Sequence, residues 1–581
     1  MKNGAILEKR VVRRQSIDHI DDQGLHPVLA RVLNHRSCGY TAYQLKDLAE
    51  PTLLSNIDSV VDRLIEHLQK QSKILIVGDY DCDGATATAV AVRGLRMLGY
   101  ASVDYLIPNR FKSGYGLSEM IIDQALAQSS SLDLLITVDN GISSISGVSY
   151  ALKRGIDVII TDHHLPGDQL PATDMIVNPQ LPGDTFPSKA ICGVGVIYYV
   201  LLALRRKLVD QGRFNRENQP NFMSLIDLVT LGTIADCVPF DQNNRILVAH
   251  GLRRFRQGLI CHGLRAMLDV IKMDLASITT VDIAFKLAPK LNAAGRMDDM
   301  SIGVQCLLSD DYESARSLAH MLVSFNEQRR DIQSSIQVEA LKQVSSSRDP
   351  SKNIRANVLY HSDWHEGVIG IIASRIKDLT HRPTIVFTDE NESLLKGSGR
   401  SIKGIHLRDA LADIHAAHDI LPKFGGHAMA AGLTIKKTDL SCFTDAFHQR
   451  IAAYADECFT EVIYTDGPLD AGELNLATAQ AIREYGIWGQ NYPEPVFDNV
   501  FAVKRVRLLK GKHLKLDLML DYQPVAAMWF FIPDACIPLI TVGVQLRAFY
   551  KLDVNTYLGE SSLSLIIEHG SAMVEAVASS A

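Results

Sequence analysis

The residues best suited to chemistry in this sequence are aspartates that come directly after an apolar run. Asp79, Asp81 and Asp83 stand at alternate positions just beyond the run KILIVG. Three carboxylates packed together repel one another strongly unless a cation neutralises them. The spacing therefore predicts a metal site at the end of a buried strand.

Two more apolar runs end in residues of the same kind. The run LDLLITV is followed by Asp139, and the run DVIIT is followed by Asp162, His163 and His164. A single aspartate at a strand end is usually a helix cap, but parallel strands carry their carboxyl ends to one edge of a sheet, where open α/β sheets bind ligands. We therefore expect the three groups to meet there, with Asp139, after the middle contributing strand, bridging two ions.

The kind of metal follows from the mixture of ligands. Many carboxylates, few histidines and no thiolate cluster suit Mn²⁺ or Mg²⁺ better than zinc, and the set is large enough for two ions. The same spacing begins a calcium-binding EF-hand loop, but Val90 stands where that loop needs a glutamate. A P-loop fails because Ala85 follows Gly84. Asp236 stands shortly before Pro239, and the pattern fits a turn residue and a metal ligand equally well.

The elements that must position these residues follow from the hydrophobic pattern. Between residues 73 and 161, short apolar runs alternate with helical segments expected at Ala85–Leu98, Ser118–Gln128 and Ile142–Arg154. This alternation is typical of a doubly wound α/β sheet with parallel strands. Residues 1–60, in contrast, show short helices and no strong strand.

The rest of the chain indicates further domains. Residues 190–345 are mainly helical and end in a long polar helix from about Asp310 to Val344, which we expect to join two domains. A second α/β pattern begins near Ile354 and contains glycine-rich turns at 397–401 and 424–432. From about residue 462, short strands without long helices between them indicate a small barrel or sandwich, with strands expected at Phe497–Leu509, His513–Leu520, Pro524–Phe531 and Pro538–Leu546.

The composition limits the class of protein. A chain of 581 residues is too long for one hydrophobic core, so several domains are expected. The nine cysteines form no Cys-x-x-Cys pair, and no apolar run is long enough to span a bilayer, which predicts a cytoplasmic protein with reduced thiols. The net charge of -7 does not by itself indicate a nucleic-acid-binding protein, because the distribution of charge matters more than the sum.

A basic stretch in the last domain has two interpretations. Such a run is often only a solvated face, but on a barrel it would also attract a nucleic-acid strand. The stretch consists of Lys504, Arg505, Arg507, Lys510, Lys512, His513 and Lys515. Aromatic residues that could stack on bases or belong to the core are Phe501, Tyr522, Trp529 and Phe530.

These motifs resemble those of the DHH phosphoesterase family, which is named for the triplet that stands here at Asp162–His164. The other matching motifs are Asp79–Gly84, Val138–Gly141 and Ala235–Pro239. Two glycine-rich segments resemble the associated DHHA1 domain, namely Gly397–Ser401 and Phe424–Ala428. The resemblance covers roughly residues 70–455. The block Leu291–Met297, the chain length and the trailing β-domain narrow it to family members that degrade single-stranded DNA.

The resemblance implies a role for each residue of the site. One ion would be bound by Asp79, Asp81 and Asp139, and the other by Asp83, Asp139, His163 and Asp236. His164 would lie on the scissile phosphate as charge stabiliser or proton donor, and Asp162 would orient a neighbouring ligand. The residues expected to hold the terminal 5′-phosphate and line the same cleft are Arg110, Arg296, Ser398, Arg400, Gly425, Gly426 and His427. From pattern alone, the first two of these could be solvated surface arginines.

The resemblance also implies a domain order and a reaction. The expected parts are an N-terminal arm (1–60), a DHH catalytic domain (61–305), a connecting helix (306–345), a DHHA1 domain (346–458) and an OB-like nucleic-acid-binding domain (459–581). The expected activity is a 5′→3′ exonuclease that degrades single-stranded DNA by two-metal-ion hydrolysis, releasing 5′-mononucleotides, in recombination and repair. Expected partners are a single-strand-binding protein and a RecQ-type helicase, and the chain is expected to be a monomer without membrane contact.

Two other functions compete with this one. Relatives of the same chemistry act on pyrophosphate, cyclic dinucleotides or short oligoribonucleotides, but they generally lack the added β-domain and the long helix. A non-catalytic scaffold with a binding role in replication would have lost several metal carboxylates, whereas all of them are present here.

Overall fold

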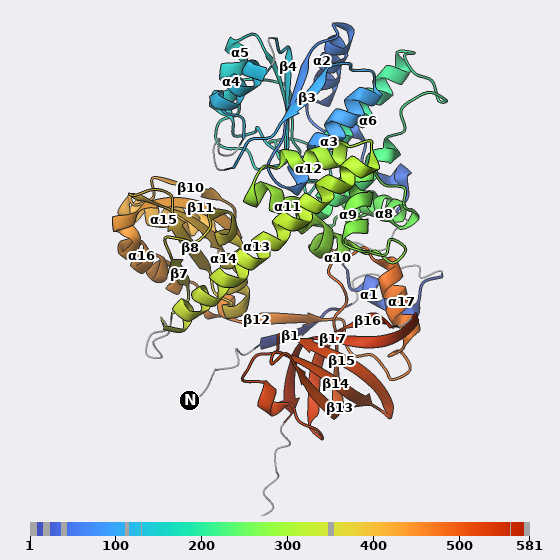
Figure 1. The fold of residues 1–581 in the computed structure, drawn as a ribbon, viewed down its shortest axis with the longest axis vertical. Coiled ribbons are helices and arrows are strands. Elements are labelled where there is room, and N and C mark those ends of the chain that lie inside the picture. Colours follow the sequence, from blue (N-terminus) through green and yellow to red (C-terminus); the bar gives the residue numbers. More distant parts are fainter. Residues whose placement is uncertain are drawn as a thin grey trace, which may run out of the picture. The chain divides into compact units, whose positions relative to one another are not determined.

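The computed structural model describes residues 9–15, 24–36, 43–110, 116–128, 131–346, 354–557 and 559–573 (Figure 1). The chain forms two compact units. The larger unit comprises Arg13–Ser324 and Thr465–Ala581, and the smaller one comprises Met1–Val12 and Phe325–Tyr464. In the part of the chain that the structure describes, no helix combines the length and the apolar character needed to cross a membrane.

The larger unit contains a parallel five-stranded sheet in the order β3-β2-β4-β5-β6. The strands are β2 (Ile74–Val77), β3 (Val103–Leu106), β4 (Leu134–Val138), β5 (Asp157–Thr161) and β6 (Ile176–Val177). Strands β2 and β4 are buried along their whole length, which explains why they appear in the sequence as unbroken apolar runs. Strand β4 lies between β2 and β5, so the predicted α/β class and the middle position of the strand before Asp139 are both confirmed.

Helices cover this sheet and extend beyond it. They are α2 (Ile57–Gln69), α3 (Cys82–Met97), α4 (Glu119–Gln128), α5 (Ile145–Lys153), α6 (Gly193–Asp210), α7 (Ile226–Ala235), α8 (Gln242–Gln257), α9 (His262–Val270), α10 (Thr280–Asp282), α11 (Ala288–Met297) and α12 (Ser301–Leu308). Helix α3 begins three residues before the predicted start, because the Asp81 carboxylate caps it by accepting from Gly84 N–H (3.0 Å). Asp83 therefore lies in the first helical turn and not in a loop.

The smaller unit is built on a second five-stranded sheet, in the order β10-β11-β9-β8-β7. Helix α13 (Tyr312–Ser346) leads into it, and the sheet strands are β7 (Asn357–Tyr360), β8 (Thr384–Asp389), β9 (Leu394–Arg400), β10 (Lys423–Gly426) and β11 (Ala430–Lys436). Its helices are α14 (Glu366–Thr380), α15 (Leu407–His418) and α16 (Leu440–Ala452). The expected glycine-rich turn at 424–432 is instead mostly strand, because β10 and β11 pair antiparallel and leave only a short turn between them.

The expectation of no strong strand within residues 1–60 is wrong for the described part. Strand β1 (Lys9–Arg13) pairs with β12 (Glu461–Thr465), and helix α1 (Pro27–Asn34) follows. The partner of β1 lies far away in the sequence, so no local pattern could reveal the pairing. Residues 1–8, 16–23 and 37–42 of this arm lie outside the described residues.

The carboxy-terminal part forms the predicted barrel. Helix α17 (Leu476–Tyr485) precedes a closed barrel in the order β13-β14-β15-β17-β16. The strands are β13 (Phe497–Leu509), β14 (His513–Leu520), β15 (Gln523–Phe530), β16 (Gln545–Tyr557) and β17 (Glu560–Met573). The strand expected at Pro538–Leu546 is wrong, because a short 3-10 helix at Ile537–Leu539 and a loop occupy that segment, and proline cannot donate to a sheet ladder.

The buried carboxylate of Asp466 joins the amino-terminal segment to the carboxy-terminal part of the larger unit. It accepts hydrogen bonds from Arg36 (2.6 Å) and Arg14 (3.0 Å) and lies 3.2 Å from the Nδ1 atom of His35. Burial alone would raise the pKa of Asp466, but hydrogen bonds and charge from these three residues lower it to about 2. Because Arg36 is also buried, each partner depends on the other for its counter-charge.

We expect Asp466→Asn to reduce stability by about 3–5 kcal/mol, because it leaves a buried guanidinium without its counter-charge. The check is the melting temperature at pH 7, compared with Asp470→Asn, which removes the same charge from an exposed position. Since the pKa of Asp466 is depressed from 3.8 to about 2, its contribution is complete above about pH 4 and is lost as the pH falls from about 4 to 2. Equal melting of the two variants at pH 7 would contradict this.

Candidate metal centre

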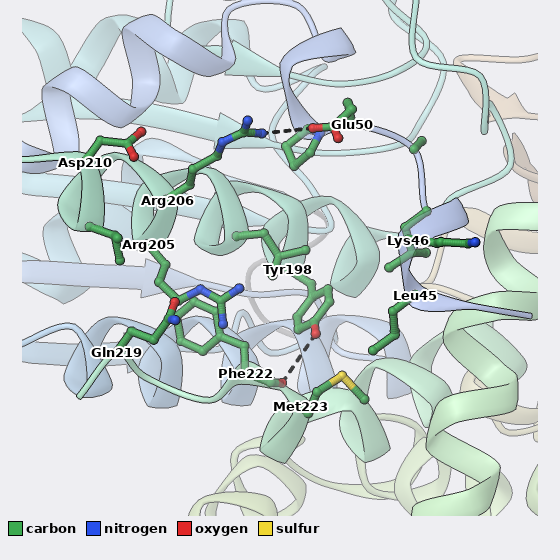
Figure 2. Close-up of a pocket in the computed structure, with 15 residues that line it drawn as sticks. Leu45, Lys46, Glu50, Tyr198, Arg205, Arg206, Asp210, Gln219, Phe222 and Met223 are labelled. Carbon is green, nitrogen blue, oxygen red and sulfur yellow. Dashed lines mark hydrogen bonds and ion pairs between the residues drawn. The ribbon is translucent and has the colours of Figure 1, made fainter. Parts of the chain in front are cut away.

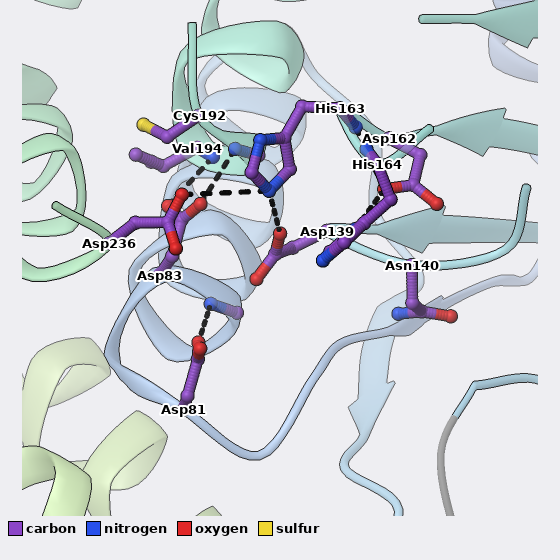
Figure 3. A network of polar contacts seen from close by, with 12 residues as sticks. Asp81, Asp83, Asp139, Asn140, Asp162, His163, His164, Cys192, Val194 and Asp236 are labelled. Carbon is purple, nitrogen blue, oxygen red and sulfur yellow. Dashed lines mark hydrogen bonds and ion pairs between the residues drawn. The ribbon is translucent and has the colours of Figure 1, made fainter. Parts of the chain in front are cut away.

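The aspartates and histidines that follow the apolar runs lie together at the carboxyl edge of the parallel sheet (Figure 3). Asp79 lies two residues beyond β2, Asp139 follows β4 directly, and Asp162 begins the triplet that follows β5. These strands are neighbours in the sheet, so their ends bring the side chains together. The edge predicted from sequence is therefore the place where the aspartates and histidines converge.

Asp79, Asp81 and Asp139 form the first group of potential ligands. One carboxylate oxygen from each lies within 4.8 Å of the others. Burial, and then the charge of Asp81, raises the pKa of Asp79 to about 8. The Oδ1 atom of Asp79 is buried and has no hydrogen-bond partner among the described residues. A buried oxygen with no donor, in a group of carboxylates, is what a bound cation would satisfy.

Asp83, His163 and Asp236 form the second group, again with ligand atoms within 4.8 Å of one another. The Nε2 atom of His163 lies 3.1 Å from Asp139 Oδ1 and 3.6 Å from Asp236 Oδ2. Asp139 thus belongs to the first group and also touches the second. Asp236, which the pattern left open, lies at the C-cap of α7, and the structure brings it to the site.

Asp83 is held by the beginning of helix α6. Its two carboxylate oxygens accept from the backbone N–H groups of Gly193 (2.6 Å) and Val194 (3.0 Å). These amides and the helix dipole favour a negative charge, yet burial and the charge of Asp81 still raise the pKa of Asp83 to about 7. The glycine pair Gly193 and Gly195 at the start of this helix is the sequence signal that could have indicated this support.

The two adjacent histidines make their shortest polar contacts with different aspartates. While His163 faces Asp139 and Asp236, the Nδ1 atom of His164 lies 2.7 Å from Asp162 Oδ1. Burial would lower the pKa of His164, but the hydrogen bond and charge of Asp162 raise it to about 9. The same contacts outweigh burial at Asp162 and lower the pKa of that carboxyl. His164 also lies within 4.8 Å of ligand atoms on Asp139 and His163.

Backbone N–H groups hold Asp162 in addition to His164. Its Oδ1 atom accepts from the N–H of His163 (2.7 Å), and its Oδ2 atom accepts from the N–H of Ile142 (2.9 Å). The carboxylate therefore ties the segment after β5 to the segment after β4. This position lets it orient the His164 ring.

The turn at Asp139 is shaped by Asn140 and Gly193, two residues to which the sequence pattern assigned no role. Asp139 itself has φ +61°, a left-handed conformation that aspartate tolerates better than most residues. The Asn140 amide donates to the carbonyls of Val77 (3.0 Å) and Val138 (2.9 Å), which locks β2 to β4 at the site. A Cβ atom at Gly193 would lie 2.5 Å from the Asp139 side chain, so only glycine permits this approach.

Two of the predicted phosphate-binding residues lie beside the first ligand group. The guanidinium carbon of Arg110 is 4.3 Å from the centre of the Tyr80 ring, and its charge lowers the pKa of Asp79 against the effect of burial. Arg296 lies in α11, next to Gly295, whose Cβ would stand only 1.9 Å from the Tyr80 carbonyl oxygen. The loop segment 111–115 beyond Arg110 lies outside the described residues.

The other predicted substrate-binding residues gather on the sheet of the smaller unit. Ser398 and Arg400 point to the same face of β9, and Arg400 Nη1 lies 3.3 Å from Ser398 Oγ. Ser398 in β9 is the cross-strand neighbour of Gly432 in β11, and Gly432 is the cross-strand neighbour of Gly425 in β10. A Cβ atom at either of these two glycines would meet nothing within 4 Å, so the backbone there is open to a ligand. The pair Gly426 and His427 forms the adjoining turn, where the N–H of the histidine donates to the carbonyl of residue 430 (2.8 Å).

The cavity in Figure 2 lies away from this chemistry. It has a volume of about 450 Å³ and runs along the second half of α6. Arg206 on its wall pairs with Glu50 (3.0 Å), and the Tyr198 hydroxyl donates to the carbonyl of Phe222 (3.4 Å). None of its lining residues belongs to the two ligand groups. The candidate catalytic site is therefore the group of side chains at the strand ends and not this cavity.

We expect Asp139→Asn to raise the melting temperature of the metal-free protein by several degrees at pH 7. Burial, and then the charges of Asp83, Asp81 and Asp79, raise the pKa of Asp139 well above its usual range, so its ionised form destabilises the fold. Asparagine keeps the shape and tolerates the left-handed backbone. The gain should shrink as the pH falls towards 4 and vanish below about pH 3, where the carboxyl is protonated in both the folded and the unfolded chain.

The same variant should lose the stabilisation that added Mn²⁺ gives the unmodified protein. Thermal melting with EDTA and with Mn²⁺ measures both effects. Asp104→Asn, at an exposed position of β3, is the matched control and should change neither. A variant that melts lower in EDTA and is still stabilised by Mn²⁺ would contradict a cation site centred on Asp139.

Comparison with known proteins agrees with this geometry. Residues 73–233 match the DHH family, N-terminal domain, residues 353–453 match the DHHA1 domain, and residues 465–569 match the RecJ OB domain. The chain is 43% identical to the single-stranded-DNA-specific exonuclease RecJ of Haemophilus influenzae, over 97% of this chain and 99% of that protein. It is 42% identical to the protein of the same name from Escherichia coli, over 96% of this chain and 98% of that protein.

Solved structures show the same relationship. The crystal structure of RecJ in complex with Mn²⁺ from Thermus thermophilus superposes with a TM-score of 0.78 and 27% identity, covering 97% of this chain and 79% of that one. A crystal structure of exonuclease RecJ bound to manganese gives a TM-score of 0.57 and 33% identity over 69% of this chain and 96% of that one. By sequence, domain content and fold, this chain belongs to the RecJ family of DHH proteins.

Proposed function

We propose that this chain is a 5′→3′ exonuclease that degrades single-stranded DNA by metal-assisted hydrolysis and releases 5′-mononucleotides. The observation that carries the proposal is the pair of ligand groups joined at Asp139. Two adjacent cation sites with a shared carboxylate suit the hydrolysis of a phosphodiester. The names of the relatives, single-stranded-DNA-specific exonucleases, support the choice of substrate. A role in recombination and repair is part of the same proposal.

The proposed ligands are Asp79, Asp81 and Asp139 for one ion and Asp83, Asp139, His163 and Asp236 for the other. Oxygen-rich ligands with a single histidine suit Mn²⁺ or Mg²⁺, and solved relatives contain each of these ions. When bound, such ions neutralise the charge of the reacting phosphate and lower the pKa of a water molecule. The chain supplies the fixed positions of the oxygens, which helix α6 and the turn at Asp139 hold in place.

His164 is the proposed catalytic side chain, and Asp162 is its positioning partner. Because the pKa of His164 is raised to about 9, its ring carries a proton at neutral pH. Hydrolysis breaks the bond between phosphorus and the 3′-oxygen of the terminal nucleotide, and that oxygen needs a proton when it leaves. A protonated ring held on Asp162 can stabilise the phosphate charge or donate that proton.

Which end of the DNA strand is cut depends on groups other than the metal ligands. Each cut of this kind leaves a new 5′-phosphate on the shortened strand, so one phosphate-binding site can serve every cycle. We propose as phosphate-binding residues Arg110 and Arg296 in the larger unit, and Ser398, Arg400, Gly425, Gly426 and His427 in the smaller unit. Guanidinium groups and open backbone N–H groups are suited to grip phosphate oxygens.

The remaining assignments are proposals of the same kind. We propose one role for each domain after the amino-terminal arm (1–60). These are catalysis for 61–305, connection for 306–345, phosphate binding for 346–458 and strand binding for 459–581. We place the protein in the cytoplasm as a monomer. A single-strand-binding protein and a RecQ-type helicase are the proposed partners, since a nuclease of this kind needs exposed single strands.

Digestion of end-labelled DNA tests the proposal. With Mn²⁺ or Mg²⁺, we expect labelled mononucleotides to appear first from the 5′ end of single-stranded DNA, faster when that end carries a phosphate. Duplex DNA and single-stranded RNA of the same sequence should be degraded more slowly, and Asp139→Asn should be inactive on all substrates. Release from the 3′ end first would disprove the proposed polarity.

We expect His164→Gln to lower kcat by about 10²–10³-fold without reducing the number of Mn²⁺ ions bound, because the side chain acts on the phosphate and not on the metals. Manganese titration by calorimetry, run beside single-turnover digestion, separates the two effects. His163→Gln is the matched control and should weaken Mn²⁺ binding. If His164→Gln loses an ion, the histidine is a ligand, as its place beside Asp139 permits.

A further inference from the structure

Phe285 exposes a large apolar ring on a firmly anchored segment. Its side chain is 74% exposed, whereas Ile283 and Leu287 in the same π-helical turn are fully buried. Just before this turn, the buried Thr280 hydroxyl lies 2.6 Å from the carbonyl oxygen of Trp488, and the Thr280 N–H donates to the carbonyl of Gly486 (3.1 Å). The exposure of the ring is therefore not the result of a loose chain end.

The π-helix runs directly into α11, and one side of the combined helix is accessible. Every residue from Leu287 to Gly295 is buried except Pro289 and Asn292. With Phe285 before them and Arg296 after them, these positions are spaced four, three and four residues apart, which places them on one side of a helix. We call these four residues the accessible stripe.

The far end of the accessible stripe lies at the metal centre. The Asn292 side-chain oxygen accepts from the N–H of Cys82, which stands between two of the metal-ligand aspartates. Gly295 packs against the carbonyl of Tyr80 so closely that a Cβ atom would lie 1.9 Å from it. The stripe thus leads from Phe285 to the segment that carries the first ligand group.

Its length can be compared with a DNA strand. Eleven residues of helix at about 1.5 Å each separate Phe285 from Arg296, roughly 16 Å in total. A stacked strand rises about 3.4 Å per nucleotide, so this span corresponds to roughly five nucleotides, and to fewer if the strand is stretched.

We propose that Phe285 binds the substrate by stacking on a base that lies about three to five nucleotides from the end held at the metal centre. The inference rests on the proposed function and adds a substrate-binding residue to it. An aromatic face accepts any base, which suits an enzyme that must move along every sequence. Single-turn π-helices of this kind also occur frequently at functional sites.

The same contact favours single strands over duplexes. A base within a duplex is already stacked on both neighbours and paired, so its faces are not available to Phe285. A base of a flexible single strand can turn one face to the ring without breaking a pair. Phe285 therefore contributes to the choice of substrate as well as to affinity.

Substrate length provides the first test. On single-stranded DNA of about twenty nucleotides, Phe285→Ala should raise KM about tenfold with little change in kcat, the usual scale of one lost stacking contact. On substrates of about two nucleotides, which end before the ring, it should change neither constant. Phe285→Trp should restore KM on the long substrate and Phe285→Leu should not, because stacking requires an aromatic face.

A fluorescent base locates the contact. We would place 2-aminopurine at successive positions of an oligonucleotide whose terminal linkage resists hydrolysis and titrate the intact protein with Mn²⁺ present. Quenching should peak about three to five nucleotides from the 5′ end and disappear at that position in Phe285→Ala. Leu259→Ala, which removes a 52% exposed apolar side chain elsewhere in the same unit, should leave KM and quenching unchanged.

The outcomes separate this inference from the proposed function. If the unmodified enzyme does not shorten single strands from the 5′ end, the proposed function fails, whatever Phe285 does. If the enzyme does so but Phe285→Ala leaves KM and quenching unchanged, the stacking role is overturned; a ring that binds a partner protein instead would give this result. An equal loss on short and long substrates would also overturn it, because that result indicates damage to the metal centre.

Discussion

Repulsion among buried carboxylates at the end of the central sheet is the constraint on which the rest of the site depends. Asp79, Asp83 and Asp139 are almost fully buried, and their pKa values are raised first by burial and then by the charges of neighbouring acids. A fold that concentrates negative charge in this way is stable only if other groups bind the charge. The backbone amides of α6 do so for Asp83, and cations are the remaining means for the others.

The elements that hold these acids do so with backbone groups and glycines. The start of α6 approaches Asp139 so closely that a Cβ atom at Gly193 would collide with it. The Asn140 amide ties β2 to β4 immediately before the ligands. Helix α11 contacts the other side of the site through Asn292 and Gly295. Together with the π-helical turn before it, α11 carries the accessible stripe that ends at Phe285. This continuous helical segment links the proposed metal ligands to the proposed path of the strand.

The barrel is part of the larger unit and is not simply attached to its end. Asp466 accepts a hydrogen bond from the N–H of Val496, the residue before the first barrel strand, and is held by Arg14 and Arg36 from the amino-terminal segment. On another side, Thr280 at the start of the helix that leads to the metal centre contacts the backbone of Gly486 and Trp488. Buried ion pairs and hydrogen bonds of this kind fix direction because they tolerate little displacement. The segment carrying Phe285 is therefore anchored to the same region that supports the barrel.

The pattern of apolar runs was enough to predict the sheet, the barrel and the edge at which the proposed ligands meet. Strand ends and apolar runs are local signals, and parallel pairing places Asp79, Asp139 and the triplet after β5 together by topology alone. Local pattern could not place Asp236, which reaches the site from α7 only through helix packing. The same holds for strand β1, the amides that bind Asp83 and the exposure of Phe285. These features depend on contacts between residues far apart in the chain, so they become visible only in the folded protein.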